Sequence, residues 1–254
     1  MSLADWFQPS RRQLDDRVRC ALKARKILAV LSHERDDLSA LTCLDVGCGS
    51  GLITQELAGS FRRTLGMELD RVTLDSGRPH DSGEGPLPLF LCGDAEQIPV
   101  RSASVDVVIC AQVYEHVADA TRLFAEIERV LAPDGVCFFS GPNAWFPIEM
   151  HTGLPLIHWL PYRWAVALAR RLGHDGYDAR PLTPGALRGR LAAFDVQDYT
   201  AAMIRTPEAF SCTDELGGLA WIGALPEWAL RRLLPLAPNV NWVLRKKGAG
   251  HGRT

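Results

Sequence analysis

Neither basic nor acidic residues dominate this chain of 254 residues. The 28 Lys and Arg residues oppose 30 Asp and Glu residues, which gives a formal net charge of −2 and a pI of about 6.4. Long nucleic acids usually bind to a basic surface, so we expect no nucleic-acid partner. No apolar run approaches the length of a membrane span, and the first residues, MSLADWFQPSRRQ, lack the apolar core of a signal peptide. These absences favour a cytoplasmic location.

The chain also lacks a CxxC pair and any internal repeat, although it has 7 cysteines. An odd number of scattered cysteines argues against a disulfide framework and against a zinc site, and indicates a reducing compartment. The length suits one α/β domain over residues 1–254 with added segments better than two independent domains.

A glycine-rich segment, TCLDVGCGSG at residues 42–51, is the most informative feature that is present. Residues 42–46 are β-branched or apolar apart from Asp45 and predict a buried strand, and the residues after Gly51 predict a helix. Glycine lets the backbone turn tightly and approach a ligand closely. The spacing Gly47-x-Gly49-x-Gly51 differs from the G-x-G-x-x-G of dinucleotide-binding turns, which disfavours an NAD-dependent oxidoreductase.

Three further features follow the glycine segment in order. Glu68 ends the strand-like run RTLGME, where a carboxylate can accept hydrogen bonds from both ribose hydroxyls. Asp94 and Ala95 follow the apolar run LFLC, and the run VDVVICAQ is followed by YEHV. Glu68 therefore indicates a nucleoside ligand.

The ordered motifs LDVGCGSG, GMELD, GDAEQIPVRSASVDVVICAQVYEHV and ERVLAPDGVCFFSGPN resemble the S-adenosylmethionine-dependent methyltransferases of the Rossmann-like class. The resemblance covers about residues 40–143 and is closest to small-molecule methyltransferases with D-A-E and E-H-V segments. It implies S-adenosylmethionine as the cofactor, with S-adenosylhomocysteine as its product. The implied fold is α/β, a doubly wound, seven-stranded, mostly parallel sheet whose last strand is antiparallel.

The resemblance also implies which residues hold the cofactor. The glycine segment would hold the methionine part, with Asp45 facing the ammonium group; Glu68 would bind the ribose, Asp94 and Ala95 the adenine, and Gln112 would lie near the methionine tail. The complete expected set is Asp45, Gly47, Cys48, Gly49, Glu68, Leu69, Asp94, Ala95 and Gln112.

His116 is the candidate catalytic residue, because an imidazole can accept a proton near neutral pH. Its position in the E-H-V segment is also compatible with a purely structural role. In metal-using relatives, such as ubiquinone-pathway O-methyltransferases, the comparable stretch reads E-x-x-E-H, whereas here Gln112 occupies the first position. A neutral amide removes an oxygen ligand that magnesium would favour, so we predict no metal.

Outside the core motifs, residues 1–40 predict a helical cover, residues 143–182 a largely helical lid, and residues 203–238 a second helical insertion. The leading helix is expected to bury Leu14, Val18, Ala21, Leu22, Ile27 and Leu28. A strand is expected at about 195–202 and the last strand at 239–247. Candidate acceptor-binding residues are Tyr114 and, in the lid, His151, His158, Tyr162, His174 and Tyr177.

The leading functional hypothesis is methyl transfer to a small-molecule acceptor, most naturally a hydroxyl of a secondary metabolite, sugar or aromatic compound. One alternative is a lipid-linked or quinone acceptor reached at a membrane surface, because arginines accompany tryptophans in residues 154–173 and 219–236. Another is a non-catalytic protein that binds the same cofactor. The acceptor and the oligomeric state stay open.

Overall fold

The computed structural model describes residues 9–76, 86–213 and 217–248, and its centre is a seven-stranded sheet of order β3-β2-β1-β4-β5-β7-β6. The strands are β1 Thr42–Val46, β2 Arg63–Glu68, β3 Leu89–Cys92, β4 Val105–Ala111, β5 Leu131–Pro142, β6 Phe194–Asp198 and β7 Asn239–Lys246. The pairs from β3 to β5 are parallel, and β7 runs antiparallel to both β5 and β6. The predicted fold class is confirmed.

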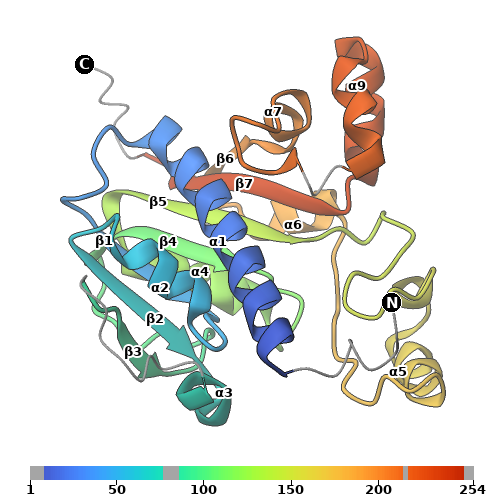
Figure 1. Cartoon of the computed structure of the whole chain (residues 1–254), viewed down its shortest axis with the longest axis horizontal. Coiled ribbons are helices and arrows are strands. Elements are labelled where there is room, and N and C mark those ends of the chain that lie inside the picture. Colours follow the sequence, from blue (N-terminus) through green and yellow to red (C-terminus); the bar gives the residue numbers. More distant parts are fainter. Residues whose placement is uncertain (1–8, 77–85, 214–216, 249–254) are drawn as a thin grey trace.

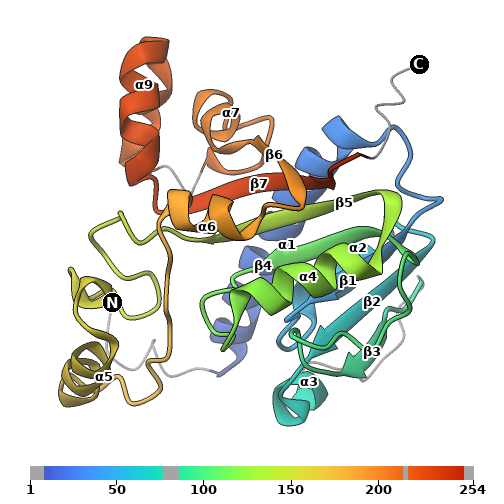
Figure 2. The ribbon, with the colours of Figure 1, turned by 180° about the vertical axis from the view of Figure 1, so that it is seen from behind.

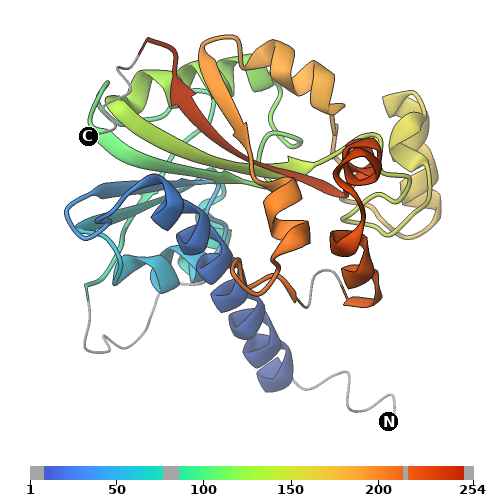
Figure 3. The same ribbon diagram turned by 90° about the horizontal axis from the view of Figure 1, so that it is seen from above.

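Helices cover both faces of this sheet (Figures 1 and 2). The helices named here are α1 Pro9–Glu34, α2 Leu52–Ala58, α3 Arg71–Ser76, α4 Ala120–Val130, α5 Tyr162–Arg171, α6 Pro184–Arg190, α7 Thr200–Arg205 and α9 Glu227–Leu233, with 3₁₀ turns at η2 Ile157–Trp159, η3 Gly217–Ala224 and η4 Leu234–Leu236. Seen from above, α4 and α6 lie on one face, and α1, α2 and α7 lie on the other (Figure 3).

The strands supply two cores because successive side chains of a strand point to opposite faces. In β4, Val107 and Ile109 pack in the core that contains Ile27 of α1, whereas Val108 and Cys110 pack in the core under α4 and α6. Strands buried on both faces are nearly continuous in apolar residues, as the sequence indicated. Within the described residues, no helix combines the length and apolar content needed to traverse a bilayer.

The leading helix differs in detail from the expected pattern. Among its described side chains, from residue 17 on, Ala24, Ile27, Val30 and Leu31 are buried and Val18 is 54% exposed; Leu14 lies outside the described side chains. The expectation that Val18 is buried was wrong, because only the C-terminal half of α1 lies against the sheet, while its N-terminal part extends beyond it (Figure 3).

The segment from 143 to 182, here called the first insertion, follows the carboxyl end of β5 and contains α5 (Figure 1). It is not largely helical as expected, since only the turn Ile157–Trp159 and the helix Tyr162–Arg171 are helical. A small core of its own holds it together, formed by Ile157, Ala165, Ala169, Tyr177 and Ala179.

The strand expected at 195–202 is also shorter than predicted. β6 ends at Asp198, whose Oδ1 accepts a hydrogen bond from the N–H of Thr200 (2.9 Å), and α7 begins there. This local cap redirects residues that are β-branched or apolar enough to continue a strand. The second insertion, residues 203–238, is helical over most of its described part, as expected.

Candidate functional site

The glycine loop joins β1 to α2 with three residues in the left-handed region. Gly47, Gly49 and Gly51 have φ values of 69°, 56° and 78°. A Cβ at Gly47 would lie 2.6 Å from Val113, and one at Gly51 would lie 2.5 Å from Phe90. At Gly49 a Cβ would meet no heavy atom within 4 Å. The loop is therefore packed closely onto the sheet at both ends and open at its middle glycine.

Glu68, at the carboxyl end of β2, holds this loop in place. Its Oε2 accepts from the N–H of Gly49 (2.9 Å), and its Oε1 accepts from those of Leu69 (2.8 Å) and Asp70 (3.1 Å). A carboxylate has about four lone-pair sites. If Glu68 is to accept from both hydroxyls of a ribose as well, at least one of these backbone bonds must be given up.

Asp45 lies in β1 beneath the loop and is 5% exposed. Its Oδ2 accepts a hydrogen bond from the Thr54 hydroxyl of α2 (2.6 Å). Burial raises the pKa of Asp45 to about 7, the Thr54 bond lowers it, and the nearby charge of Glu68 raises it further. Asp45 forms no ion pair within the described residues. A cationic group of a ligand placed near Asp45 would therefore provide the positive charge that the protein does not supply there.

The expected adenine-side residues lie after β3. Asp94 is exposed and its Oδ1 accepts from the N–H of Glu96 (2.8 Å), so it caps a turn. Ala95 is half-buried against the main core. Asp94 thus has a structural role in this turn, and its other carboxylate oxygen has no hydrogen-bond partner among the described residues.

Gln112, the first residue after β4, has φ of 59°, which is uncommon for a residue with a side chain. Its N–H donates to Ser140 O (2.8 Å), and its amide Nε2 donates to Asn239 Oδ1 (3.3 Å). A strained backbone of this kind is often found at functional sites. The strain turns the following residues, 113–116, across the carboxyl edge of the sheet.

Tyr114 was expected to bind an acceptor, and its environment contradicts that expectation. The ring is 2% exposed; its hydroxyl donates to Pro142 O and accepts from the N–H of Leu182 (3.0 Å). Both of its hydrogen-bonding functions are thus used to attach the first insertion to β5.

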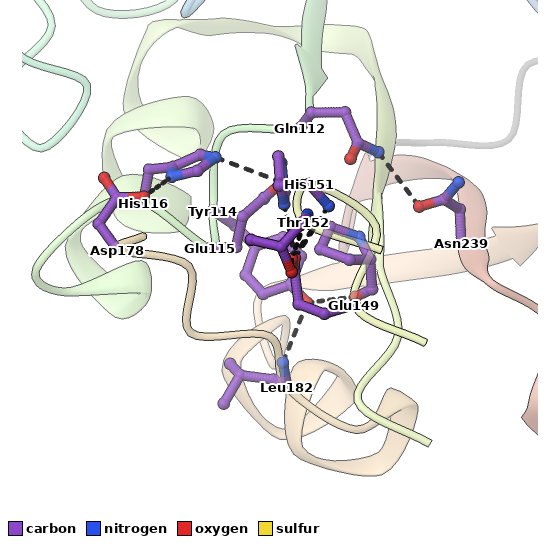
Figure 4. A network of polar contacts seen from close by, with 11 residues as sticks. Gln112, Tyr114, Glu115, His116, Glu149, His151, Thr152, Asp178, Leu182 and Asn239 are labelled. Carbon is purple, nitrogen blue, oxygen red and sulfur yellow. Dashed lines mark hydrogen bonds and ion pairs between the residues drawn. The ribbon is translucent and has the colours of Figure 1, made fainter. Parts of the chain in front are cut away.

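Glu115, His116 and His151 form a cluster beside Tyr114 (Figure 4). The Glu115 side chain is fully buried, and its Oε1 lies 3.9 Å from His116 Nε2 and 3.7 Å from His151 Nε2. Burial raises the pKa of Glu115 to about 7. His116 Nδ1 contacts Asp178 (2.8 Å), and His151 Nδ1 contacts Glu149 (2.8 Å).

A pocket of about 240 Å³ opens beside this cluster, between the end of β4 and the first insertion. Its lining includes His116, His151, His174 and Tyr177, which the sequence suggested. Thr152, Gly176, Asp178 and Ala179 complete it. The Tyr177 hydroxyl is buried without a hydrogen-bond partner among the described residues.

The other two expected acceptor residues do not line that pocket. His158 Nε2 lies 3.2 Å from Ala144 O, and the Tyr162 ring carries the guanidinium of Arg180 over its face at 4.2 Å. Sequence reasoning missed Glu149 and Asp178, which hold the two histidines. The spacing Glu149-x-His151 was the only local signal for either of them.

The strand order, the open glycine loop and the carboxylate at the end of β2 are those of a Rossmann-like domain, a fold that binds its ligands at the carboxyl edge of the sheet. Residues 44–139 match the family model described as a methyltransferase domain. The chain carries a Rossmann-like domain of the S-adenosylmethionine-dependent methyltransferase class.

Individual relatives agree with this assignment. A probable S-adenosylmethionine-dependent methyltransferase of Mycolicibacterium smegmatis is 36% identical over 39% of this chain and 37% of its own length. A ubiquinone biosynthesis O-methyltransferase of Coxiella burnetii is 28% identical over 43% of this chain and 47% of its own length. The match thus spans less than half of either relative.

Among solved structures, an S-adenosylmethionine-dependent methyltransferase from Mesorhizobium loti superposes with a TM-score of 0.57 at 17% identity, covering 85% of this chain and 96% of that one. At this identity the likeness concerns the fold. S-adenosylmethionine is the cofactor of the class, and the open space over Gly49 fits a ligand that must approach the backbone closely.

Proposed function

We propose that the protein transfers a methyl group from S-adenosylmethionine to a hydroxyl of a small-molecule acceptor. The observation that carries this proposal is the pocket lined by His116, which follows β4, one of the parallel strands whose carboxyl ends carry the motif residues. The name of the Coxiella relative, an O-methyltransferase, supports an oxygen acceptor.

The cofactor residues are proposed from the positions they occupy. Gly47, Cys48 and Gly49 present backbone to the methionine part, and Asp45 attracts its ammonium group. Glu68 and Leu69 lie at the ribose. The remaining members are Asp94 and Ala95 at the adenine and Gln112 beside the methionine tail, all on loops that follow β3 and β4.

His116 is the proposed proton acceptor. Asp178 holds the Nδ1 proton of His116, which leaves Nε2 as the nitrogen with a lone pair. The cofactor supplies a methyl group already activated by its sulfonium. As the oxygen–methyl bond forms, the carbon–sulfur bond breaks with its electron pair left on sulfur, and the hydroxyl proton goes to His116. The products are S-adenosylhomocysteine and a methyl ether. Position and exclusion of water provide most of the rate increase.

Calorimetric titration with S-adenosylhomocysteine tests the first step, with Glu68→Gln and Asp70→Asn as a matched pair. Asp70 caps α3 through bonds from Val72 and Thr73, so its variant should bind normally. Glu68→Gln should bind at least about tenfold more weakly, because an amide cannot accept the same set of hydrogen bonds. Normal binding by Glu68→Gln, or no binding by the wild type, contradicts the proposal.

Turnover is tested by incubating the protein with S-adenosylmethionine and a panel of hydroxylated compounds, with S-adenosylhomocysteine as the readout. His116→Ala should retain cofactor binding and lose turnover. Binding without turnover on any acceptor or extract would instead favour the non-catalytic alternative.

A lipid-linked acceptor reached at a membrane surface is the second candidate, and exposed side chains favour it. Large apolar residues of the two insertions face outward, and arginines lie beside them. The aromatic members are Trp145, Trp159, Tyr162, Trp164, Trp221 and Trp228, and the arginines are Arg163, Arg170, Arg171, Arg231 and Arg232. Such a surface is typical of interfacial helices. Sedimentation with anionic liposomes at low salt tests it, and a protein that stays in the supernatant excludes it.

A further inference from the structure

Three electron-pair donors from separate parts of the chain converge at one point (Figure 4). Glu115 and His116 follow β4, and His151 comes from the first insertion. One ligand atom from each residue lies within 4.8 Å of the other two, and both Nε2 atoms lie within 4 Å of Glu115 Oε1. The cluster therefore joins the sheet edge to the insertion that covers it.

Each histidine is oriented by a carboxylate on its other nitrogen. Asp178 contacts His116 Nδ1, and Glu149 contacts His151 Nδ1, both at 2.8 Å. Glu149 is 2% exposed and also accepts from the backbone N–H groups of His151 and Thr152 and from the Thr152 hydroxyl. The Glu149 carboxylate therefore takes the Nδ1 side of the His151 ring, which leaves Nε2, 3.7 Å from Glu115 Oε1, as the nitrogen with a lone pair.

Glu115 has no partner suited to its burial. Its side chain is fully buried, and neither of its oxygens has a hydrogen-bond partner among the described residues. Within the described part of the chain, the carboxylates of Glu115, Glu149 and Asp178 face histidines, and no lysine or arginine side chain forms an ion pair or hydrogen bond with them. Two imidazole lone pairs that face a buried carboxylate repel it unless a proton or a metal cation lies between them.

We infer that Glu115, His116 and His151 bind a divalent transition-metal ion, such as Zn²⁺, Fe²⁺ or Co²⁺. Two nitrogens and one oxygen suit these ions better than magnesium, which favours oxygen ligands. Three protein ligands leave at least one coordination position open, as in catalytic sites. Carboxylates behind both histidines are the usual second contacts of metal-binding imidazoles. Gln112, whose amide donates to Asn239, takes no part.

The distances require a small adjustment. Ligand atoms around a tetrahedral zinc ion lie about 3.3–3.5 Å apart, given bond lengths of roughly 2.0–2.1 Å. The separations between Glu115 Oε1 and the two Nε2 atoms, 3.7 and 3.9 Å, are slightly longer, and the two nitrogens lie within 4.8 Å of each other. Rotation of the half-exposed imidazoles can close this difference, because both rings border the pocket.

The site has a role in the proposed methyl transfer, and that part of the inference rests on the proposed function. An ion at this position would face the pocket and lower the pKa of an acceptor hydroxyl bound there. In the metal-loaded protein His116 is then a ligand, and the hydroxyl proton is released to solvent without direct transfer to Nε2.

Titration of untagged, chelator-treated protein with Co²⁺, followed by visible absorption and calorimetry, tests the inference. The wild type should bind one ion and show ligand-field bands without a thiolate charge-transfer band, which excludes binding by cysteine. His151→Ala and Glu115→Gln should lose that binding. Glu149→Gln and Asp178→Asn should weaken it by about 10–100-fold, because they release the imidazoles. His174→Ala is the matched control, since His174 lines the same pocket outside the cluster.

S-adenosylhomocysteine titration of every variant reports folding and separates the two proposals. Failure of the wild type to bind Co²⁺ while it still binds S-adenosylhomocysteine overturns the metal site alone. Equal Co²⁺ affinity in the wild type and His151→Ala overturns it as well, and so does an equal loss in His174→Ala. Co²⁺ binding without S-adenosylhomocysteine binding leaves the metal site standing and overturns the proposed function.

Discussion

Replacing Asp45 by Asn should change how the stability of the protein depends on pH. Asp45 is buried beneath the glycine loop, and its pKa rises from the ordinary value of 3.8 to about 7 in the folded state. Between these values the folded protein binds more protons than the unfolded chain, so the free energy of unfolding falls as pH rises. The full cost of the charged form is about 4 kcal/mol.

Roughly 2–3 kcal/mol of this cost falls between about pH 5 and about pH 8. Asp45→Asn removes the titration, so its stability relative to the wild type should increase by that amount over the same interval. Any change that the new amide makes to the free energy of unfolding independently of pH cancels when the two pH values are compared. Urea unfolding of both proteins without cofactor at the two pH values provides the measurement.

Asp119→Asn serves as the control. Bonds from the N–H groups of Thr121 and Arg122 lower the pKa of Asp119, an exposed cap. A carboxylate with a lowered pKa stabilises the folded protein fully above its ordinary pKa, and this stabilisation is lost only at lower pH. The difference in the free energy of unfolding between Asp119→Asn and the wild type should therefore stay constant from about pH 5 to about pH 8. A difference for Asp45→Asn that is equally constant would refute the reasoning. Asp45→Asn should also bind S-adenosylhomocysteine at least about tenfold more weakly than the wild type, because the ammonium group of the ligand loses its charged partner.

Three further substitutions separate stability from cofactor binding. Gly49→Ala should cost about 1 kcal/mol of stability from its φ of 56° and reduce S-adenosylhomocysteine affinity by at least about tenfold in calorimetry, since the methyl projects into the open space. Tyr114→Phe should lower the free energy of unfolding by about 1–3 kcal/mol, because it leaves the Pro142 carbonyl and the Leu182 N–H without their hydrogen-bond partner. Its S-adenosylhomocysteine affinity should stay unchanged, and a stable variant with weakened binding would contradict this. Gln112→Gly should keep or raise thermal stability by relieving backbone strain while it lowers turnover, and full turnover would exclude Gln112 from the site.

The cofactor side of the site could be predicted from sequence because its residues are local. Gly47, Gly49 and Gly51 adopt left-handed conformations that the glycine spacing indicates, and Glu68 follows directly on a strand. Parallel strands bring their carboxyl ends to one edge, so residues after β1, β2, β3 and β4 had to gather there. The ends of strands and helices were harder to predict where a polar side chain sets them. Asp198, which accepts a hydrogen bond from the N–H of Thr200 at the end of β6, is an example.

The acceptor side could not be derived in the same way. Tyr114 and His116 are two residues apart, yet one is a buried attachment point and the other borders the pocket. His151 joins that pocket, while His158, seven positions later, contacts the backbone at Ala144. No periodicity distinguishes these cases, since the first insertion is mostly irregular.

The amino-acid sequence alone therefore determined the sheet and the glycine loop, because strand alternation and left-handed glycines act over a few residues. The class of cofactor followed from the resemblance of the ordered motifs in residues 40–143 to a known family. The convergence of Glu115, His116 and His151 was decided only by the tertiary structure, as was the contact between His116 and the distant Asp178. That cluster depends on how an irregular insertion packs against the end of β4, and such packing is set by the whole chain.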